Sequence, residues 1–284
     1  MNDEVTIILV SHKSKNLILN FIKNFYTKYK ILIIDNSNDI DLKKILEKKY
    51  PEITIRIIEN NGYASAINYG SKLVKTNYFL ISNPDIEGLT SINIDKFLDV
   101  AKKLNDNFSL LGPRYIGADK KSHIQSNPKI EIAEMKFISG ACMFFKKEIF
   151  DKLGGFDENF FLYFEESDFC LRAHKIYKNY QINTIEVKHN VGSSVKVENT
   201  DEKNNLMELY NWHFIWSKFY FFKKNYGFLI SIIYFLPILI RTNIKIFYFR
   251  ILSKHEKRKK YQIRYNALIS SIKGLKAYKR INNF

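Results

Sequence analysis

The chain has 284 residues, 46% hydrophobic and 26% charged, which suits one large domain, or one domain with a smaller appendage, around a real hydrophobic core. Its two cysteines, Cys142 and Cys170, exclude a disulfide framework and give no metal-ligand spacing, so a reducing cytosol is the simplest location. The N-terminus, MNDEVTIILVSHKS, lacks the basic start and the longer apolar region of a signal peptide.

The net charge of +16 is concentrated near the end of the chain. After Trp216 there are 16 Lys and Arg residues against the single acid Glu256, which gives +15, whereas residues 1–216 carry 29 basic and 28 acidic side chains. A nearly neutral body with a strongly basic end favours a polyanionic partner, either nucleic acid or an anionic membrane surface.

From residue 5 to residue 82 the sequence alternates between strand-like and helix-like segments. Helical patterns at residues 17–26, 42–49 and 64–74 separate short apolar runs that are rich in β-branched residues. Such strands, alternating with helices, predict a parallel sheet covered on both faces. The predicted strands are VTIILV (5–10), ILIID (31–35), ITIRIIE (53–59) and YFLIS (78–82).

Polar residues follow each of these strands. They are Ser11-His12 after the first strand, DNSN (35–38) after the second, NNGY (60–63) after the third and NPD (83–85) after the fourth. Ligands of parallel α/β sheets bind at the carboxyl ends of the strands, so these residues are site candidates, although each is also an ordinary loop sequence. The absence of a Gly-x-Gly-x-x-Gly or Walker-type loop argues against a dinucleotide-binding dehydrogenase and a P-loop NTPase.

The middle of the chain predicts a helix after Asn93, a strand in FSLLGPRY (108–115), and a strand within residues 135–150. This last strand would carry the small residues Ser139, Gly140 and Ala141, which indicate close approach of another backbone or of a ligand.

The segment FFLYFEESDFCLRA (160–173) predicts a helix from near Phe164 to Tyr177, with the acids Glu165, Glu166 and Asp168 in its first turn. Acids stabilise a helix N-terminus, so a structural role can account for them. Adjacent Glu165 and Glu166 point about 100° apart on a helix and cannot share one role. The flanking aromatic residues would desolvate a carboxylate and raise its pKa toward that of a useful base.

From Asn199 onward the sequence is helical, aromatic and basic, so we place a domain boundary between residues 198 and 199. The most apolar segment, FLISIIYFLPILI (228–240), contains Pro237 and is shorter than the about 20 residues that span a bilayer. We expect a helix that lies in the membrane interface with Lys and Arg reaching the phosphates; a buried core helix is the alternative.

In this order the motifs resemble those of the inverting nucleotide-sugar glycosyltransferases of family 2, which have a GT-A fold, and most closely their rhamnosyltransferase-like branch. The resemblance covers residues 5–194 and implies an α/β GT-A domain, with a mostly parallel sheet flanked by helices, in residues 1–198. A basic, aromatic helical extension that we expect to associate with a membrane would follow in residues 199–284. The motifs are IIDNSN, NNGYASAINYG, NPD, ISGACMFFKKEIFDKLGGFDENFFLYFEESDFCLR and HNVGSS.

The resemblance implies roles for individual residues. Asp35 would contact the pyrimidine base of the donor, Asp85 and His189 would bind Mn²⁺ or Mg²⁺, and Glu166 would be the catalytic base, with Glu165 as the alternative. The metal motif has one carboxylate where the family has two, and Glu166 stands where Asp is common. The other implied residues are Ser11, Asn61, Gly62, Asn68 and Asn83 for the nucleotide-sugar, and Gly140, Asp168 and Arg172 on the acceptor side.

The resemblance thus implies transfer of rhamnose or a similar sugar from a dTDP- or UDP-linked donor to a saccharide or polyprenyl-linked acceptor in cell-surface polysaccharide synthesis. The protein would be cytoplasmic and peripheral at the inner face of the cell membrane. One alternative is a nucleotidyltransferase, which needs a Gly-rich phosphate loop that SHKSKN (11–16) lacks. The other is a non-catalytic membrane- or nucleic-acid-binding protein that uses the basic C-terminal region.

Overall fold

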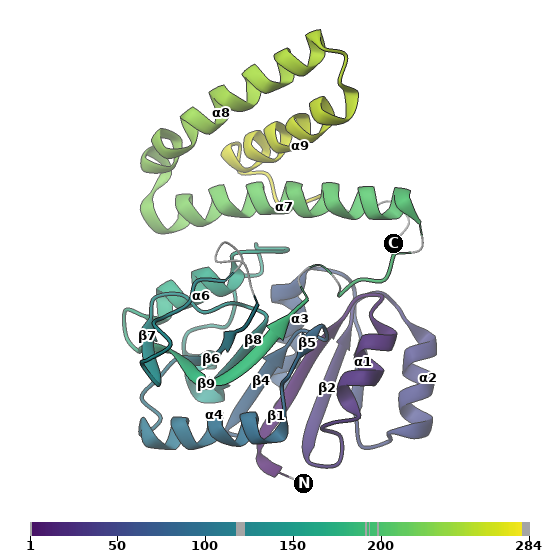
Figure 1. Cartoon of the computed structure of the whole chain (residues 1–284), viewed down its shortest axis with the longest axis vertical. Coiled ribbons are helices and arrows are strands. Elements are labelled where there is room, and N and C mark those ends of the chain that lie inside the picture. The colour runs from purple at the N-terminus through teal and green to yellow at the C-terminus, as the bar shows by residue number, and fades with distance from the viewer. Residues whose placement is uncertain (1, 118–122, 191, 193, 198, 280–284) are drawn as a thin grey trace. The chain divides into compact units, whose positions relative to one another are not determined.

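The computed structural model describes residues 2–117, 123–190, 192, 194–197 and 199–279, which form two compact units (Figure 1). The sheet unit comprises Met1–Asp157 and Phe169–Lys196, and the helical unit comprises Glu158–Asp168 and Val197–Phe284. The sequence instead groups residues 158–168 with the sheet, because the motif that contains them runs on continuously from residue 138.

The sheet unit contains one mixed sheet of nine described strands, in the order β3-β2-β1-β4-β8-β6-β9-β5, with β7 paired to β9. The strands are β1 (Asn2–Ser11), β2 (Tyr29–Asp35), β3 (Thr54–Ile57), β4 (Tyr78–Ser82), β5 (Ile86–Glu87), β6 (Leu110–Tyr115), β7 (Ile132–Met135), β8 (Cys142–Lys146) and β9 (Asn179–His189). Helices α1 (Lys15–Ile22), α2 (Ile40–Lys49), α3 (Tyr63–Leu73), α4 (Ser91–Lys103) and α5 (Lys147–Lys152) flank it, with the part of α6 (Glu165–Ala173) that follows Asp168.

Strands β1 to β4 form the parallel half of the sheet that the sequence predicts. β1 pairs in the parallel direction with β2 and β4, and β2 pairs in the same way with β3. β8 then joins β4 in the antiparallel direction. Because these four strands run in the same direction, their carboxyl ends lie at one edge of the sheet.

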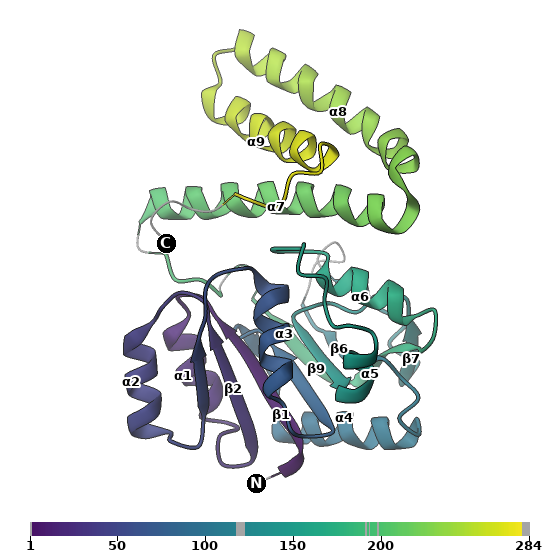
Figure 2. The ribbon, with the colours of Figure 1, turned by 180° about the vertical axis from the view of Figure 1, so that it is seen from behind.

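Both faces of the sheet are covered by helices, which explains why these strands are apolar on both sides. Leu9 and Ile33 pack with side chains of α1, α2 and α4, whereas Ile8 and Ile34 point the other way and pack with α3, α5 and α6. Figures 1 and 2 show the two layers from opposite sides.

Two segments differ from the sequence-based expectation. Ser139, Gly140 and Ala141 lie in the turn before β8 rather than within a strand, and the Ala141 carbonyl accepts a hydrogen bond from the backbone N–H of Asn83 (2.8 Å). Helix α6 ends at Ala173 rather than Tyr177, because the N–H groups of Ile176 and Tyr177 both bond to the Ala173 carbonyl in a closing turn.

The helical unit contains α7 (Thr200–Tyr226), α8 (Phe228–Ile251) and α9 (His255–Ile272). Phe219 of α7, Phe235 of α8 and Leu268 of α9 share one buried cluster. The indole N–H of Trp212 donates to Oδ1 of Asn266 (2.9 Å) and that of Trp216 to the carbonyl of Leu275 (3.0 Å). The two large aromatic side chains are therefore buried with their polar atoms satisfied.

Helix α8 is longer than the sequence suggests. It extends beyond the 13-residue apolar run and continues through Pro237 to Ile251, so the proline removes one backbone donor without ending the helix. Among the described residues, α8 is the one helix long and apolar enough to cross a membrane, and 17% of its most apolar stretch is buried.

Candidate active site

Polar side chains link the carboxyl ends of β1, β2 and β3. Nδ1 of His12 lies 2.8 Å from Oδ1 of Asn36, and Nδ2 of Asn36 donates to Oδ1 of Asn60 (3.2 Å). Oδ1 of Asn60 also accepts from the backbone N–H of Gly62 (3.3 Å). Burial lowers the pKa of His12, which favours the neutral ring. The structure thus brings together three of the loops that the sequence nominates.

Asp35 and Ser11 are fully buried at this edge of the sheet. They lie opposite each other in the pairing of β1 with β2. Oδ1 of Asp35 accepts from the N–H groups of Ser37 (3.1 Å) and Asp39 (3.0 Å), and the Ser37 hydroxyl donates to Oδ2 (3.1 Å). The Asp35 carboxylate, expected to contact a pyrimidine base, therefore also fixes the loop after β2.

Asn61 and Gly62 form the entry to α3 at the same edge. Gly62 precedes the helix with φ of +99°, a conformation that residues with a Cβ rarely adopt. Asn61 is exposed, and its Nδ2 lies 3.4 Å from a carboxylate oxygen of Glu59. Both residues stand beside the Asn36–Asn60 contact, and their binding of a nucleotide-sugar stays a prediction.

Asn68 and Arg172 have structural roles that the sequence does not reveal. Asn68 forms two hydrogen bonds with the backbone of Phe156, donating to its carbonyl (2.9 Å) and accepting from its N–H (3.0 Å). Arg172 donates to the carbonyls of Leu153 (2.5 Å) and Gly155 (2.6 Å). Both side chains therefore fasten the turn at residues 153–156, and the contacts of Asn68 with a nucleotide and of Arg172 with an acceptor stay predictions.

Asp85 lies in the corner after β4 and is 3% exposed. Its Oδ2 accepts from the Ser194 hydroxyl (2.6 Å), and its Oδ1 lies 3.4 Å from Nε2 of His189. The backbone N–H of Asn190 reaches the Asp85 carbonyl (3.3 Å). The NPD corner and the late HNVGSS motif, about 100 residues apart in sequence, therefore meet as expected.

The pair formed by Asp85 and His189 has the chemistry of a partial divalent-metal site. Oδ1 of Asp85 is buried without a hydrogen-bond partner among the described residues, and it faces the His189 nitrogen. A carboxylate oxygen next to an imidazole nitrogen suits Mn²⁺, whereas Mg²⁺ prefers oxygen ligands. Within the described ranges no group of three or more His, Cys, Asp or Glu side chains could hold an ion. A bound diphosphate or water would supply further ligands.

Asn83 and Gly140 adjoin this corner. The hydroxyl of Tyr63, the residue that starts α3, lies 3.3 Å from Oδ1 of Asn83 and 3.4 Å from the carbonyl of Gly140. Gly140, expected on the acceptor side, thus shares a neighbour with the NPD corner.

His123 is a site residue that the sequence did not indicate. Its Nε2 lies 3.1 Å from Nδ1 of His189, and its ring stacks on Tyr115 with centroids 4.0 Å apart. Burial, with a smaller contribution from the charge of His189, lowers the pKa of His123 to about 4, so its ring is neutral at physiological pH. No motif or periodicity marks this residue, because it lies in an irregular loop.

The acidic segment belongs to the helical unit and begins with an unusual backbone. Tyr163 and Phe164 have φ of +68° and +70°, the left-handed region that bulky residues avoid at a cost of about 1–3 kcal/mol each. Aromatic side chains of α7 hold both residues: Tyr163 contacts Tyr210 and Phe214, and Phe164 contacts Phe214 and Phe221. These contacts explain why residues 158–168 group with the C-terminal helices.

Glu165 and Glu166 occupy different environments on the first turn of α6. Glu165 is buried, its Oε2 has no hydrogen-bond partner among the described residues, and burial followed by repulsion from Glu166 raises its pKa well above the usual value. Glu166 is partly exposed and accepts a hydrogen bond from the Ser167 hydroxyl (2.8 Å). Desolvation raises the pKa of Glu166 too, and the Ser167 hydrogen bond opposes that shift.

Asp168 is fully buried and anchored to the end of α7. Its Oδ2 lies 2.9 Å from the Lys224 ammonium, and its Oδ1 accepts from Nδ2 of Asn225 (3.2 Å). Its backbone N–H bonds to the Phe164 carbonyl (2.9 Å) and closes the first turn. Asp168 therefore supports the acidic turn, and its acceptor-side role stays a prediction.

Comparison with known proteins decides the family. The sequence profile described as glycosyl transferase family 2 matches residues 6–179, more than half of the chain. The chain belongs to glycosyl transferase family 2. Two relatives that act on sugars by name are similar to it. The low-salt glycan biosynthesis hexosyltransferase Agl10 of Haloferax volcanii is 24% identical over 201 residues, 62% of this chain and 63% of that one. Rhamnosyltransferase WbbL of Escherichia coli K12 is 26% identical over 201 residues, 59% of this chain and 76% of that one.

Solved structures confirm the GT-A fold of this family 2 member. The TarS fragment 1–349 of S. aureus, in complex with UDP-GlcNAc, matches 98% of this chain and 94% of its own with a TM-score of 0.53 and 13% identity. GalNAc-T7 with UDP, GalNAc and Mn²⁺ matches 76% of this chain and 50% of its own, with a TM-score of 0.51 and 12% identity. The chain spans just under two thirds of the length of Agl10.

Replacing Asn68 tests whether its side chain stabilises the fold or binds a nucleotide. Asn68→Ala leaves the buried N–H and carbonyl of Phe156 without their partner, so we expect it to lower the free energy of unfolding by about 2–4 kcal/mol in urea denaturation. UDP affinity, measured by calorimetry on the folded protein, should not change. Asn68→Asp keeps the acceptor but places a buried carboxylate against the Phe156 carbonyl, so it should lose at least as much. Normal stability combined with weaker UDP binding would restore the nucleotide role.

Removing the cation beside Asp168 should destabilise the helical unit. Lys224→Met leaves a carboxylate with no exposed surface and without its ammonium partner, and we expect a loss of about 3–5 kcal/mol in unfolding experiments. The double variant Lys224→Met/Asp168→Asn should recover most of the loss. Lys223→Met, one residue earlier on α7, is the matched control and should change little. Equal losses of stability in Lys224→Met and Lys223→Met would refute a specific role of the ion pair between Lys224 and Asp168.

Proposed function

We propose that this family 2 member is an inverting glycosyltransferase that transfers a sugar, rhamnose or a similar hexose, from a dTDP- or UDP-linked donor to a hydroxyl group. The observation that carries the proposal is the buried Asp85 carboxylate, whose unpartnered oxygen faces His189 at the carboxyl edge of the sheet. The names of Agl10 and WbbL, a hexosyltransferase and a rhamnosyltransferase, support the reaction class.

The donor would bind along the edge formed by β1 to β4. The loops around Asp35, Asn61 and Gly62 would hold the nucleoside, because they supply hydrogen-bonding groups at the carboxyl ends of parallel strands. Asn83 and Asp85 follow β4 and would lie toward the diphosphate. The UDP complex of TarS has a similar fold, which supports a uridine or thymidine nucleotide as the donor class.

Asp85 and His189 are the residues that would hold a divalent cation. When bound, Mn²⁺ or Mg²⁺ would neutralise the charge that develops on the departing diphosphate. The chain itself supplies one carboxylate and one imidazole, with Ser194 holding the other carboxylate oxygen. His189 requires an unprotonated Nε2 for this role.

Glu166 would act as the general base. A partly exposed carboxylate with a raised pKa can take the proton of the acceptor hydroxyl as that hydroxyl attacks the anomeric carbon. A single displacement with no covalent intermediate inverts the anomeric centre. Glu165 is buried, and burial together with repulsion from Glu166 raises its pKa well above the usual value, so we assign proton transfer to Glu166 and not to Glu165.

Glu166→Gln should abolish transfer and leave donor binding intact. We expect kcat to fall by at least about 100-fold, measured with a panel of dTDP- and UDP-sugars and Mn²⁺, while the Kd for UDP stays within twofold. Because the pKa of Glu166 is raised, wild-type kcat should fall as pH drops, at a higher pH than an ordinary glutamate would give. Glu165→Gln is the control and should retain turnover. Normal turnover in Glu166→Gln would exclude this residue as the base.

We further propose that the helical unit binds an anionic membrane, which would present a lipid-linked acceptor. Seven large apolar side chains recur every three or four residues along α8 and are 48–75% exposed. They form one continuous stripe on the helix. The residues are Leu229, Ile233, Leu236, Ile240, Ile244, Phe247 and Ile251.

Basic residues flank the stripe in the way that interfacial helices require. Measured around the helix axis from the middle of the stripe, Arg241 lies about 100° to one side and Arg250 about 80° to the other. Both side chains can therefore reach lipid phosphates while the stripe enters the acyl region. The opposite face of α8 carries the buried residues Ser231, Phe235 and Thr242. Phe235 on this face packs in the core of the helical unit. A helix with one face committed to protein is better suited to lie in the interface than to span the bilayer alone.

Vesicle binding tests this surface. The full chain should sediment with vesicles that contain phosphatidylglycerol, and binding should weaken with salt and with pure phosphatidylcholine. Ile233→Glu/Ile244→Glu should reduce binding by roughly tenfold or more, because two apolar side chains no longer enter the bilayer. Ile92→Glu, on a similarly exposed isoleucine of α4, is the control. Unchanged binding, a shift only in oligomeric state, or equal competition by DNA would contradict the membrane assignment.

A further inference from the structure

His123 is held rigidly behind the proposed metal ligand. It is 5% exposed, and both of its ring nitrogens have partners: Nε2 lies 3.1 Å from Nδ1 of His189, and Nδ1 lies 2.9 Å from the hydroxyl of Ser139. The Tyr115 ring stacks on its face with only 7° between the planes. The position and orientation of its imidazole are therefore fixed by three neighbours.

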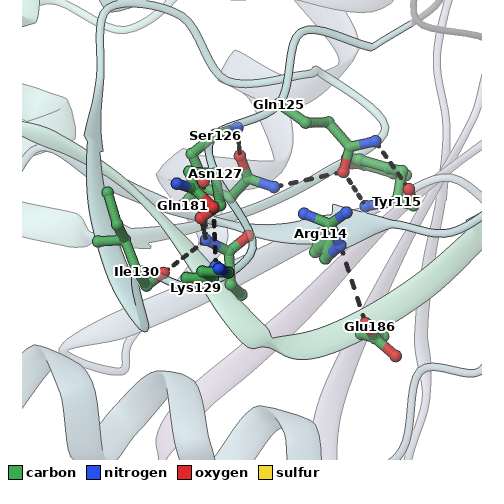
Figure 3. Close-up of polar contacts among 10 residues, drawn as sticks. Arg114, Tyr115, Gln125, Ser126, Asn127, Lys129, Ile130, Gln181 and Glu186 are labelled. Atoms are coloured by element: carbon green, nitrogen blue, oxygen red, sulfur yellow. Dashed lines mark hydrogen bonds and ion pairs between the residues drawn. The ribbon is translucent and has the colours of Figure 1, made fainter.

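The loop after His123 is fastened to β6 and β9 (Figure 3). Gln125 exchanges two hydrogen bonds with the backbone of Tyr115, at 2.7 and 2.8 Å. Oε1 of Gln181 on β9 accepts from the N–H of Ser126 (2.8 Å). β6 supplies Tyr115, and β9 supplies Gln181 and also ends in His189. The loop that carries His123 and the strand that carries His189 are thus joined at several points.

The neighbour of one imidazole nitrogen determines the state of the other. A neutral imidazole has one N–H and one lone pair. If Nδ1 of His189 carries the hydrogen, Nε2 presents a lone pair beside Oδ1 of Asp85. If Nε2 carries it instead, that hydrogen points at the carboxylate and neither atom can ligate a cation through this face. Ligating histidines are usually held in one tautomer by a hydrogen bond of the second nitrogen.

We propose that His123 is a positioning residue whose Nε2 accepts the Nδ1 hydrogen of His189, so that the Nε2 lone pair of His189 faces Asp85. The hydrogen on Nδ1 of His123 is then donated to Ser139. This inference rests on the proposed function for the identity of the cation, but the tautomer of His189 is a property of the protein alone. Ser139 lies next to Gly140 in the turn before β8, so the chain of contacts runs from that turn to the proposed metal site.

The tautomer can be measured directly on the full chain. In long-range ¹H–¹⁵N spectra of protein labelled at histidine, His189 should show a protonated Nδ1 and an unprotonated Nε2. In His123→Phe, which keeps a ring for stacking on Tyr115 and removes the acceptor, the Nε2–H form should become the major one. His123→Gln offers a side-chain oxygen as acceptor and should largely retain the wild-type signal. His255→Gln, at an exposed histidine, is the matched control.

Cation binding gives a second readout. With UDP present, His123→Phe should weaken Mn²⁺ binding by about 10- to 100-fold in titrations followed by electron paramagnetic resonance, with His123→Gln closer to wild type. A wild-type His189 that carries its hydrogen on Nε2, or an unchanged tautomer in His123→Phe, would overturn the inference. If wild-type protein binds no Mn²⁺ with UDP, the metal part of the proposed function fails, and the spectra still decide the role of His123.

Discussion

The pairing of two short stretches of backbone, Ile86 of β5 opposite His189 of β9, is the constraint on which the candidate site depends. Asp85 immediately precedes Ile86, so this ladder contact brings its carboxylate beside an imidazole that lies about 100 residues later in the chain. Burying a carboxylate costs several kcal/mol unless partners compensate. The Ser194 hydroxyl and the His189 ring lie beside the two carboxylate oxygens, and both come from the end of β9 or the residues that follow it. The position of Asp85 thus depends on completion of the last strand.

The parallel half of the sheet and its polar edge could be predicted from the sequence, because the signal is local. Continuous β-branched runs mark buried strands, and ILIID and YFLIS match β2 and β4 within two residues. Contacts between segments that are distant in the sequence leave no local pattern from which they could be predicted. Asn68 lies in a motif that suggests a nucleotide contact, yet its amide is used by the backbone of Phe156, which only folding brings near. His123 is similarly invisible, since its partners come from β6, β9 and the turn before β8.

The acidic segment shows how a motif can be read correctly and grouped wrongly. Glu165, Glu166 and Asp168 do occupy the first turn of a helix, as predicted. Sequence continuity placed them with the sheet, whereas Tyr163, Phe164 and Asp168 are held by side chains of α7. Ring packing and the buried ion pair offset the cost of two consecutive left-handed residues, and neither interaction is visible in a run of eleven residues.

Assignment of residues 158–168 to the helical unit has an evolutionary consequence. In the proposed function, nucleotide recognition belongs to the sheet unit, while proton abstraction and lipid contact belong to the other unit. Substitutions along α7, α8 and α9 could then adapt such an enzyme to a new bilayer or a new hydroxyl substrate and leave the loops after β1 to β3 untouched. Lineages of this design would be expected to conserve the activated sugar they use for longer than the molecule they decorate.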